Sequence, residues 1–146
     1  MALKDDAWRL ALDRYPMHMR IQTRYGDMDA NAHLNNVAIA RLVEEARVRF
    51  HYALKLRVAS TDPSGIMIVH AAIDYIGEGH YPGDVDAGIG IAAVGGVSYR
   101  LAIGLFQQGK AFALAESVMV NLAPDRSGSA PIDDGLRQNL EAMRHR

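Results

Sequence analysis

Apolar side chains recur at helical spacing in one stretch of the first half of the sequence. They begin at Ile39 and end at Leu54, and they follow the i, i+3, i+4, i+7 pattern of a helix that buries one face. Asn35 lies just before this stretch and is a suitable N-cap for a helix that starts at Asn36 or Val37. The pattern therefore predicts one long amphipathic helix.

On both sides of this helix the apolar pattern changes to a period of two, which is typical of half-buried strands. Residues 17–24 alternate before the helix, and residues 67–75, 85–93 and 99–105 alternate after it. Residues 112–121 predict a fourth strand in this later run, although their alanines leave a helix open. The side chains expected to share one face of the first later strand are Met67, Val69, Ala71, Ile73 and Tyr75.

Glycine-rich segments between the predicted strands indicate turns. Gly95-Gly96 and residues 107–110 are typical of hairpin turns, whereas residues 77–83 form a longer connection. Residues 61–65 contain a proline and small polar residues and predict a loop between the helix and the later strands.

The two ends of the chain carry weaker helical patterns. Residues 1–15 predict a short helix that Pro16 stops. A proline- and serine-containing linker then follows the last strand and leads to a short charged helix near residues 132–145. We expect a single domain over residues 1–124, with the linker and short helix over residues 125–146.

The order of these elements predicts an α+β fold: one strand, one long helix, and then an antiparallel run of about four strands. The helix must lie against the sheet, because nothing else in the sequence can cover its apolar face. The opposite strand faces are rich in alanine and glycine, which suits close packing by a second subunit. We therefore expect a homo-oligomer.

Composition restricts the class of function more than it identifies one. The chain has 146 residues, a formal net charge of −1 and no cysteine. It therefore lacks the basic surface that nucleic acid or an anionic membrane would require, and it has neither disulfides nor a thiolate nucleophile. No stretch is apolar enough to span a bilayer, and acidic residues interrupt the N-terminal segment where a signal peptide would be apolar. These features favour a soluble cytoplasmic protein.

Candidate chemistry is concentrated in the segment just before the long helix. Asp27, Asp29, His33, Asn35 and Asn36 all lie there. Carboxylates, an imidazole and the free amides of a helix N-terminus are the groups needed to attack a carbonyl carbon and to stabilise its oxyanion. The segment therefore predicts a site for acyl-group chemistry.

Several other interpretations of these residues are weaker. An isolated Asp-x-Asp is most often part of a turn, and a histidine beside it often bonds a backbone carbonyl. The spacing of Asp27, Asp29 and His33 is not a recognised metal-ligand pattern, so we expect no metal. The sequence has no Gly-x-Ser-x-Gly elbow, which argues against a serine hydrolase. The glycines around Ile89 lie inside a strand and do not open a helix, so we expect no dinucleotide cofactor.

The motifs of this segment and of a later one resemble a known family. Tyr25-Gly26-Asp27-Met28-Asp29, His33-Leu34-Asn35-Asn36 and Glu44-Glu45-Ala46-Arg47 are similar to the hotdog-fold acyl-CoA thioesterases of the 4-hydroxybenzoyl-CoA thioesterase-like family. Asp74-Tyr75 and residues 79–85 resemble that family's strand-loop-strand segment. The resemblance implies an antiparallel sheet of five or six strands wrapped around a long central helix. It also implies paired edge strands in a homodimer, often a dimer of dimers, with active sites between subunits.

The resemblance also implies roles for individual residues. Asp29 matches the catalytic carboxylate, and the backbone N–H of Asn36 matches the oxyanion donor. His33 would orient water or the thioester, and Asn35 would hold the local geometry. Residues 96–98 match a turn that lies against the substrate; they are Gly96, Val97 and Ser98.

The implied activity is hydrolysis of acyl-CoA or acyl-carrier-protein thioesters without cofactor or metal. The alternative is a hotdog protein that binds acyl-CoA without hydrolysing it. Three residues depart from the family's pattern: Ala32 replaces a frequent glycine, Ile39 a frequent tyrosine and Val97 a frequent arginine or aromatic residue. Ile39 would contact the substrate. None of the three departures removes the carboxylate or the oxyanion amide, so they affect the choice of substrate more than the chemistry.

Overall fold

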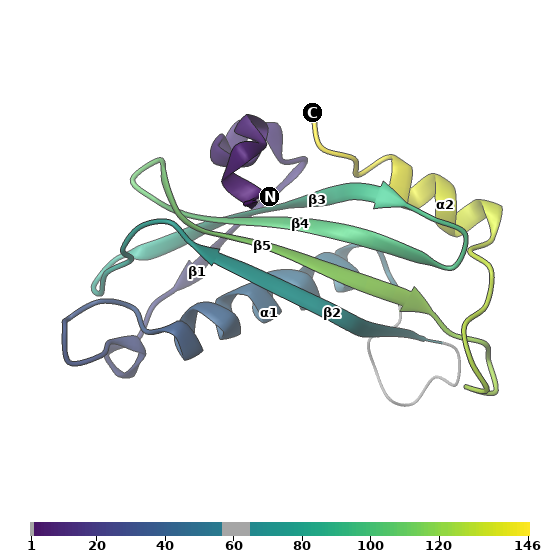
Figure 1. Cartoon of the computed structure of the whole chain (residues 1–146), viewed down its shortest axis with the longest axis horizontal. Coiled ribbons are helices and arrows are strands. Elements are labelled where there is room, and N and C mark those ends of the chain that lie inside the picture. Colours follow the sequence, from purple (N-terminus) through teal and green to yellow (C-terminus); the bar gives the residue numbers. More distant parts are fainter. Residues whose placement is uncertain (1, 57–64) are drawn as a thin grey trace.

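Five antiparallel strands form one sheet in the computed structural model, which describes residues 2–56 and 65–146 (Figure 1). In spatial order the strands are β1 (Met17–Gln22), β3 (Asp84–Val94), β4 (Ser98–Gln107), β5 (Lys110–Asn121) and β2 (Ile66–Tyr75). β1 and β2 are therefore the two edges of the sheet. The predicted strands and the α+β class are confirmed, whereas residues 61–64 of the predicted loop lie outside the described residues.

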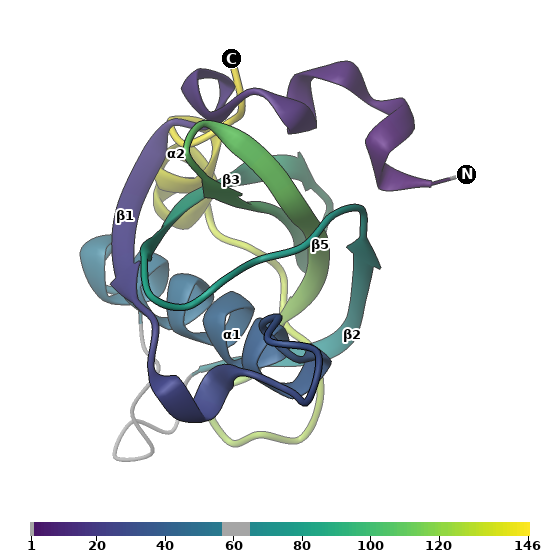
Figure 2. The same ribbon diagram turned by 90° about the vertical axis from the view of Figure 1, so that its left-hand side faces the viewer.

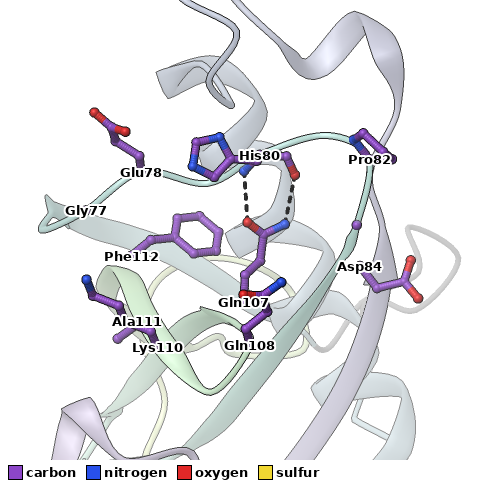
Figure 3. A pocket seen from close by; sticks show the side chains of 11 residues that line it. Gly77, Glu78, His80, Pro82, Asp84, Gln107, Gln108, Lys110, Ala111 and Phe112 are labelled. Atoms are coloured by element: carbon purple, nitrogen blue, oxygen red, sulfur yellow. Dashed lines mark hydrogen bonds between the residues drawn. The ribbon is translucent and has the colours of Figure 1, made fainter.

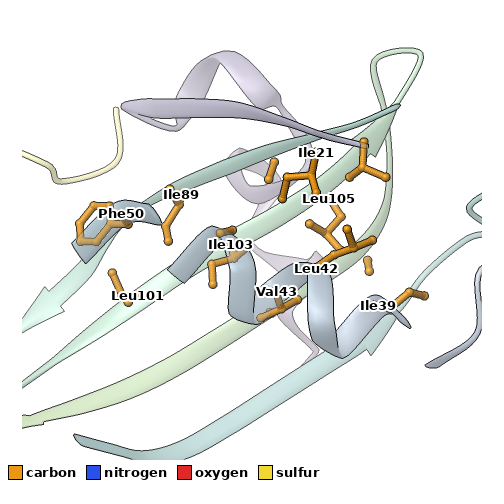
Figure 4. Packing of buried hydrophobic residues seen from close by; sticks show 14 of the residues in the cluster. Ile21, Ile39, Leu42, Val43, Phe50, Ile89, Leu101, Ile103 and Leu105 are labelled. Carbon is orange, nitrogen blue, oxygen red and sulfur yellow. The ribbon is translucent and has the colours of Figure 1, made fainter. Parts of the chain in front are cut away.

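The long helix α1 (Asn36–Ala53) lies in the concave face of this sheet, which curls around it (Figure 2). Its apolar stripe packs onto the inward-facing side chains of the central strands (Figure 4). Leu42, Ala46 and Phe50 are fully buried there, opposite residues such as Ile103. Burying each large side chain of this kind contributes about 1.5–3 kcal/mol, so this interface is the main source of stability.

The alternation along β2 does not sort buried from exposed residues as the sequence predicted. A register shift between Ile68 and His70 interrupts the strand, and Met67, Val69 and Tyr75 are all about half exposed. β2 pairs with β5 alone, so one edge of β2 lies open in the protomer. The expectation that these side chains all share one face with Ala71 and Ile73 is therefore wrong, because the bulge at Val69 breaks the alternation between Met67 and Ala71.

The N-terminal segment is not the predicted α-helix. It forms three short 3-10 turns (Leu3–Asp5, Ala7–Leu10 and Leu12–Arg14). Extended backbone at Asp6 and Ala11 separates these turns and prevents a continuous helix.

This N-terminal segment covers part of the glycine-rich outer face of the sheet, a face expected from the sequence to pack against a partner subunit. The ring of Tyr15 is buried against Gly88 and Gly104. A Cβ atom at Gly88 would lie 2.7 Å from this ring, and one at Gly104 would lie 2.8 Å from the Tyr15 hydroxyl. The glycines therefore make room for the chain's own tyrosine.

The C-terminal helix α2 (Asp134–Glu141) is shorter than predicted and lies beside the far end of β3 (Figure 1). The side chain of Asp133 caps it by accepting a hydrogen bond of 2.7 Å from the backbone N–H of Leu136. Ile132 and Leu140 are buried in the same core cluster as α1. None of the helices among the described residues is long and apolar enough to cross a membrane.

Candidate active site

The turn that carries Asp29 is closed by hydrogen bonds to both its backbone and its side chain. The Asp29 N–H donates to the carbonyl of His33 over 2.8 Å. Asp29 Oδ1 accepts hydrogen bonds from the backbone N–H groups of Asn31 at 2.8 Å and His33 at 3.3 Å. The other oxygen, Oδ2, accepts no hydrogen bond from the described residues, and the side chain is exposed. One oxygen therefore holds the carboxylate while the second is available for chemistry.

The N-terminus of α1 follows this turn directly. Asn35 caps the helix, since its Oδ1 accepts a hydrogen bond of 2.8 Å from the Ala38 N–H. The first N–H groups of a helix have no carbonyl partner within it, so the cap leaves those of Asn36 and Val37 pointing outward. The partial positive charge of an 18-residue helix adds to their ability to bind an oxyanion. The structure thus places Asp29 and His33 in one closed turn, and Asn35 and Asn36 at the start of the helix that follows it.

Asp27, the other carboxylate of this segment, is buried and ties the turn to α1. Only 2% of it is exposed. Its Oδ2 accepts hydrogen bonds from the backbone N–H of Arg24 at 2.8 Å and from the Arg41 guanidinium at 2.9 Å. Burial alone would raise the pKa of Asp27, but the Arg24 hydrogen bond and the charges of Arg41 and Arg24 outweigh it and lower that pKa. Asp27 therefore has a structural role.

His33 contacts the loop between β2 and β3. The loop was predicted from the sequence, but this contact was not. Nε2 of His33 lies 3.1 Å from Oε2 of Glu78, and the His33 ring packs edge-on against that of His80 at 5.3 Å between centroids. The N–H of Leu34 donates to the carbonyl of Gly79 over 2.8 Å. Glu78 is therefore a functional candidate. The sequence places it in the loop of residues 77–83 and predicted no role for it.

A cavity of about 730 Å³ lies between this loop and the turn that joins β4 to β5 (Figure 3). Its lining is largely polar and includes Glu78, His80, Gln107 and Lys110, with Phe112 as an apolar wall. Asp29 and the N-terminus of α1 do not line it. We place the chemistry at the helix N-terminus, because the free amides and the carboxylate are there.

The predicted substrate-binding residues lie away from this cluster within the protomer. Gly96, Val97 and Ser98 belong to the turn between β3 and β4, at the opposite end of the sheet from Asp29. β3 has 11 residues, so about 35 Å separates the two ends. Ile39 is 4% exposed and packs in the core cluster (Figure 4). Contact between these four residues and a substrate stays a prediction.

The described residues hold no group of three histidine, cysteine, aspartate or glutamate side chains placed to bind a metal ion.

Comparison with known proteins agrees with this fold. Residues 23–140 match the sequence profile of the Thioesterase-like superfamily. The chain belongs to the thioesterase-like superfamily. The family resemblance noted in the sequence is therefore confirmed. The sequence has no significant match among proteins of curated function.

Solved structures similar to this superfamily member share its hotdog fold. The PA5185 protein of Pseudomonas aeruginosa is 24% identical, with a TM-score of 0.82 over 93% of this chain and 96% of that one. A thioesterase from Thermus thermophilus, crystallised with coenzyme A and zinc, is 22% identical, with a TM-score of 0.77 over 90% and 96%. A gentisyl-coenzyme A thioesterase is 18% identical, with a TM-score of 0.74 over 85% and 99%. At these identities the comparisons establish the hotdog fold of this thioesterase-like chain.

Proposed function

We propose that this chain hydrolyses acyl thioesters of coenzyme A or of acyl carrier protein in the cytoplasm, without metal or cofactor. The observation that carries the proposal is the juxtaposition of Asp29 with the N-terminus of α1. Asp29, whose Oδ2 accepts no hydrogen bond from the described residues, lies in the turn just before α1, and the N–H of Asn36 opens that helix; attack on a thioester carbonyl requires such a carboxylate and such an amide. Membership of the superfamily supports a thioester substrate.

The reaction would place the thioester oxygen at the N–H of Asn36. Oδ2 of Asp29 then either attacks the acyl carbon, which gives a mixed anhydride that water hydrolyses, or takes a proton from a water that attacks instead. In both routes the carbon–sulfur bond breaks, the thiol leaves, and one water is consumed per carboxylic acid formed. His33 would orient the water or the thioester, and Asn35 keeps the helix terminus in place through its cap.

We also propose a homodimer formed through β2, because this strand is an edge of the sheet and its exposed side chains are largely apolar. Large exposed apolar residues gather on this strand: Met67, Ile68, Val69 and Tyr75. An antiparallel pair of β2 strands would satisfy the unpaired backbone groups and bury these side chains.

The same dimer would bring the predicted substrate-binding turn to the site of the other subunit. β2 begins at Ile66, which pairs with Asn121, and the Asn121 N–H donates to Val97 in the β3–β4 turn. β2 ends at Tyr75, just before the loop that contacts His33. Antiparallel pairing therefore directs the partner's turn toward the end that holds Asp29. The backbone amides of the partner's β3–β4 turn would then lie against the pantetheine or the nucleotide phosphates of the substrate.

Release of free thiol from a panel of short, medium, long and aromatic acyl-CoAs tests the proposal. The wild-type protein should hydrolyse at least one of them. Asp29→Asn keeps the shape of the turn but removes the charge, so it should lose most of the turnover and still bind the thioester. Equal turnover in this variant would contradict the role of Asp29.

The competing function is binding of acyl-CoA without hydrolysis. A binding protein has no need of a carboxylate with a free oxygen beside the carbonyl site, which favours the enzyme. Tight binding of acyl-CoA by the wild-type protein, together with no thiol release from any member of the panel, would establish the competing function instead.

A further inference from the structure

Glu78 reaches the candidate site from a loop that is distant from it in sequence. Its Oε2 lies 3.1 Å from Nε2 of His33, although 62% of the Glu78 side chain and 34% of the His33 side chain are exposed. Among the described residues, no other carboxylate lies within ion-pair distance of this imidazole. An exposed glutamate gains little stability from such a contact, so its removal should leave the fold intact.

The loop is held against the site by contacts that do not involve the Glu78 carboxylate. The carbonyl of Gly79 accepts the hydrogen bond from the Leu34 N–H described above. The side chain of Gln107 accepts from the backbone N–H of His80 and donates to its carbonyl, each over 2.8 Å (Figure 3). A Cβ atom at Gly79 would lie 2.8 Å from both Leu34 and Phe112, so a side chain there would force the loop or these two side chains to shift. Glu78 is thus presented to His33 by a fixed backbone.

The negative charge of Glu78 favours one of the two ring nitrogens as the site of the proton. An unprotonated nitrogen 3.1 Å from a carboxylate oxygen would set two lone pairs against each other, so the carboxylate favours the proton on Nε2. In the neutral imidazole this leaves the lone pair on Nδ1. The backbone N–H of His33 is meanwhile bonded to Asp29 Oδ1, so the ring and the carboxylate belong to one closed turn.

We propose that Glu78 is a positioning residue for the reaction of this site. It holds the proton of His33 on Nε2, so that Nδ1 is the acceptor that orients the attacking water beside Asp29. Glu78 itself does not touch the substrate, and no proton leaves His33 in this role. The inference rests on the proposed hydrolase function.

Heteronuclear NMR of the histidine ring nitrogens tests the contact without any substrate. At about pH 8, where an ordinary histidine is neutral, the wild-type His33 ring should show the signals of the Nε2-protonated tautomer. A His33→Gln spectrum assigns these signals. Glu78→Ala should shift them toward a mixture of tautomers, whereas Asp84→Asn, which alters a carboxylate at the other end of the same loop, should not. Identical His33 signals in Glu78→Ala and wild type would overturn the proposal.

Steady-state kinetics on the best substrate of the panel test the consequence. Glu78→Ala should lower kcat about tenfold and change KM by less than about twofold, because misorientation affects the chemical step more than binding. Glu78→Gln keeps an acceptor oxygen and should recover most of the loss. A loss of kcat in Glu78→Ala that Glu78→Gln does not recover would overturn the proposed mode of action.

These two measurements separate failure of this inference from failure of the proposed function. If the wild-type protein hydrolyses thioesters but Glu78→Ala keeps full kcat, the positioning role is wrong and the hydrolase function stands. If the tautomer follows Glu78 but no thioester is hydrolysed, the hydrolase function is wrong and the role of Glu78 in the reaction is overturned with it.

Discussion

The imidazole of His51 and the hydroxyl of Tyr99 form a buried hydrogen bond, with 2.7 Å between Nε2 and the hydroxyl oxygen. Each residue is only 1% exposed, and the pair joins the last turns of α1 to β4. Burial raises the pKa of Tyr99, so its hydroxyl stays protonated and donates to the neutral ring of His51. This polar contact lies inside an otherwise apolar core and is distant from the candidate site.

The pH dependence of stability follows from this pair. Burial lowers the pKa of His51 to about 4, although a hydrogen bond to the backbone of Arg47 opposes the shift. The unfolded chain titrates near the ordinary value of 6.5 and therefore binds the proton first as pH falls. The contribution of neutral His51 to the free energy of unfolding is therefore fully present above pH 6.5 and is lost as the pH falls toward 4. We expect the free energy of unfolding to drop by about 2 kcal/mol between about pH 7 and about pH 5.

Denaturant unfolding at several pH values measures this change, and His51→Gln is the control. Glutamine does not titrate, so the dependence on pH over this interval should become flatter, whatever the absolute stability of the variant. A slope as steep in His51→Gln as in the wild-type protein would assign the effect to other histidines.

Asp27→Asn should destabilise the turn that presents Asp29. Asparagine loses the charge that the Arg41 and Arg24 guanidinium groups face, so two charge-assisted contacts weaken at a buried position. We expect a loss of about 2 kcal/mol in the free energy of unfolding and a lower turnover.

The matched control is Asp125→Asn, since the Asp125 carboxylate also closes a turn, by accepting from the Ser127 N–H at 2.9 Å, but lies on the surface. Thermal unfolding of the two variants compares a buried with an exposed carboxylate. Equal stability of the two would refute the structural role of Asp27.

The residues that the sequence could predict are those whose role depends on near neighbours. The apolar period of α1, the cap at Asn35 and the position of Asp29 before it are all local features, and the structure contains each of them. Glu78 escaped prediction because its partner, His33, lies far along the chain and meets it only through the packing of the loop.

The errors in the predicted elements have similar physical causes. A β-bulge adds one residue without changing composition, so the shift near Val69 was invisible in the alternation of β2. The N-terminal turns depend on the glycines that admit Tyr15 to the outer face, and no helical pattern records that contact. Tertiary packing decided these elements, whereas local periodicity decided the strands and α1.

Gly79→Ala should disturb the site through the loop that carries Glu78. The added methyl group would meet Leu34 and Phe112 at 2.8 Å, and Phe112 is buried. Either the loop moves away from His33 or the two side chains shift, at a cost of about 1–3 kcal/mol. We expect a lower melting temperature and a lower kcat.

Gly128→Ala is the matched control for this substitution, because a Cβ atom at Gly128 has open space around it and the residue lies in the C-terminal linker. Its melting temperature should match that of the wild-type protein within error. A Gly79→Ala protein with unchanged melting temperature and kcat would show that the loop tolerates displacement from His33.

Val69→Lys should separate the proposed dimer, because it places a charge on the open edge of β2. Val69 is 55% exposed in the protomer, so the lysine costs little in the isolated chain. In an antiparallel pair of β2 strands the two lysines would face an apolar surface and lie near one another across the two-fold axis, which opposes association. Light scattering should give a monomer mass, and turnover should fall with it, because each site loses the partner's β3–β4 turn.

Leu10→Lys places the same charge on an exposed apolar residue of the N-terminal segment and should leave mass and turnover unchanged. A Val69→Lys protein that remains dimeric would move the interface away from β2, and a monomer with full turnover would show that one protomer holds a complete site.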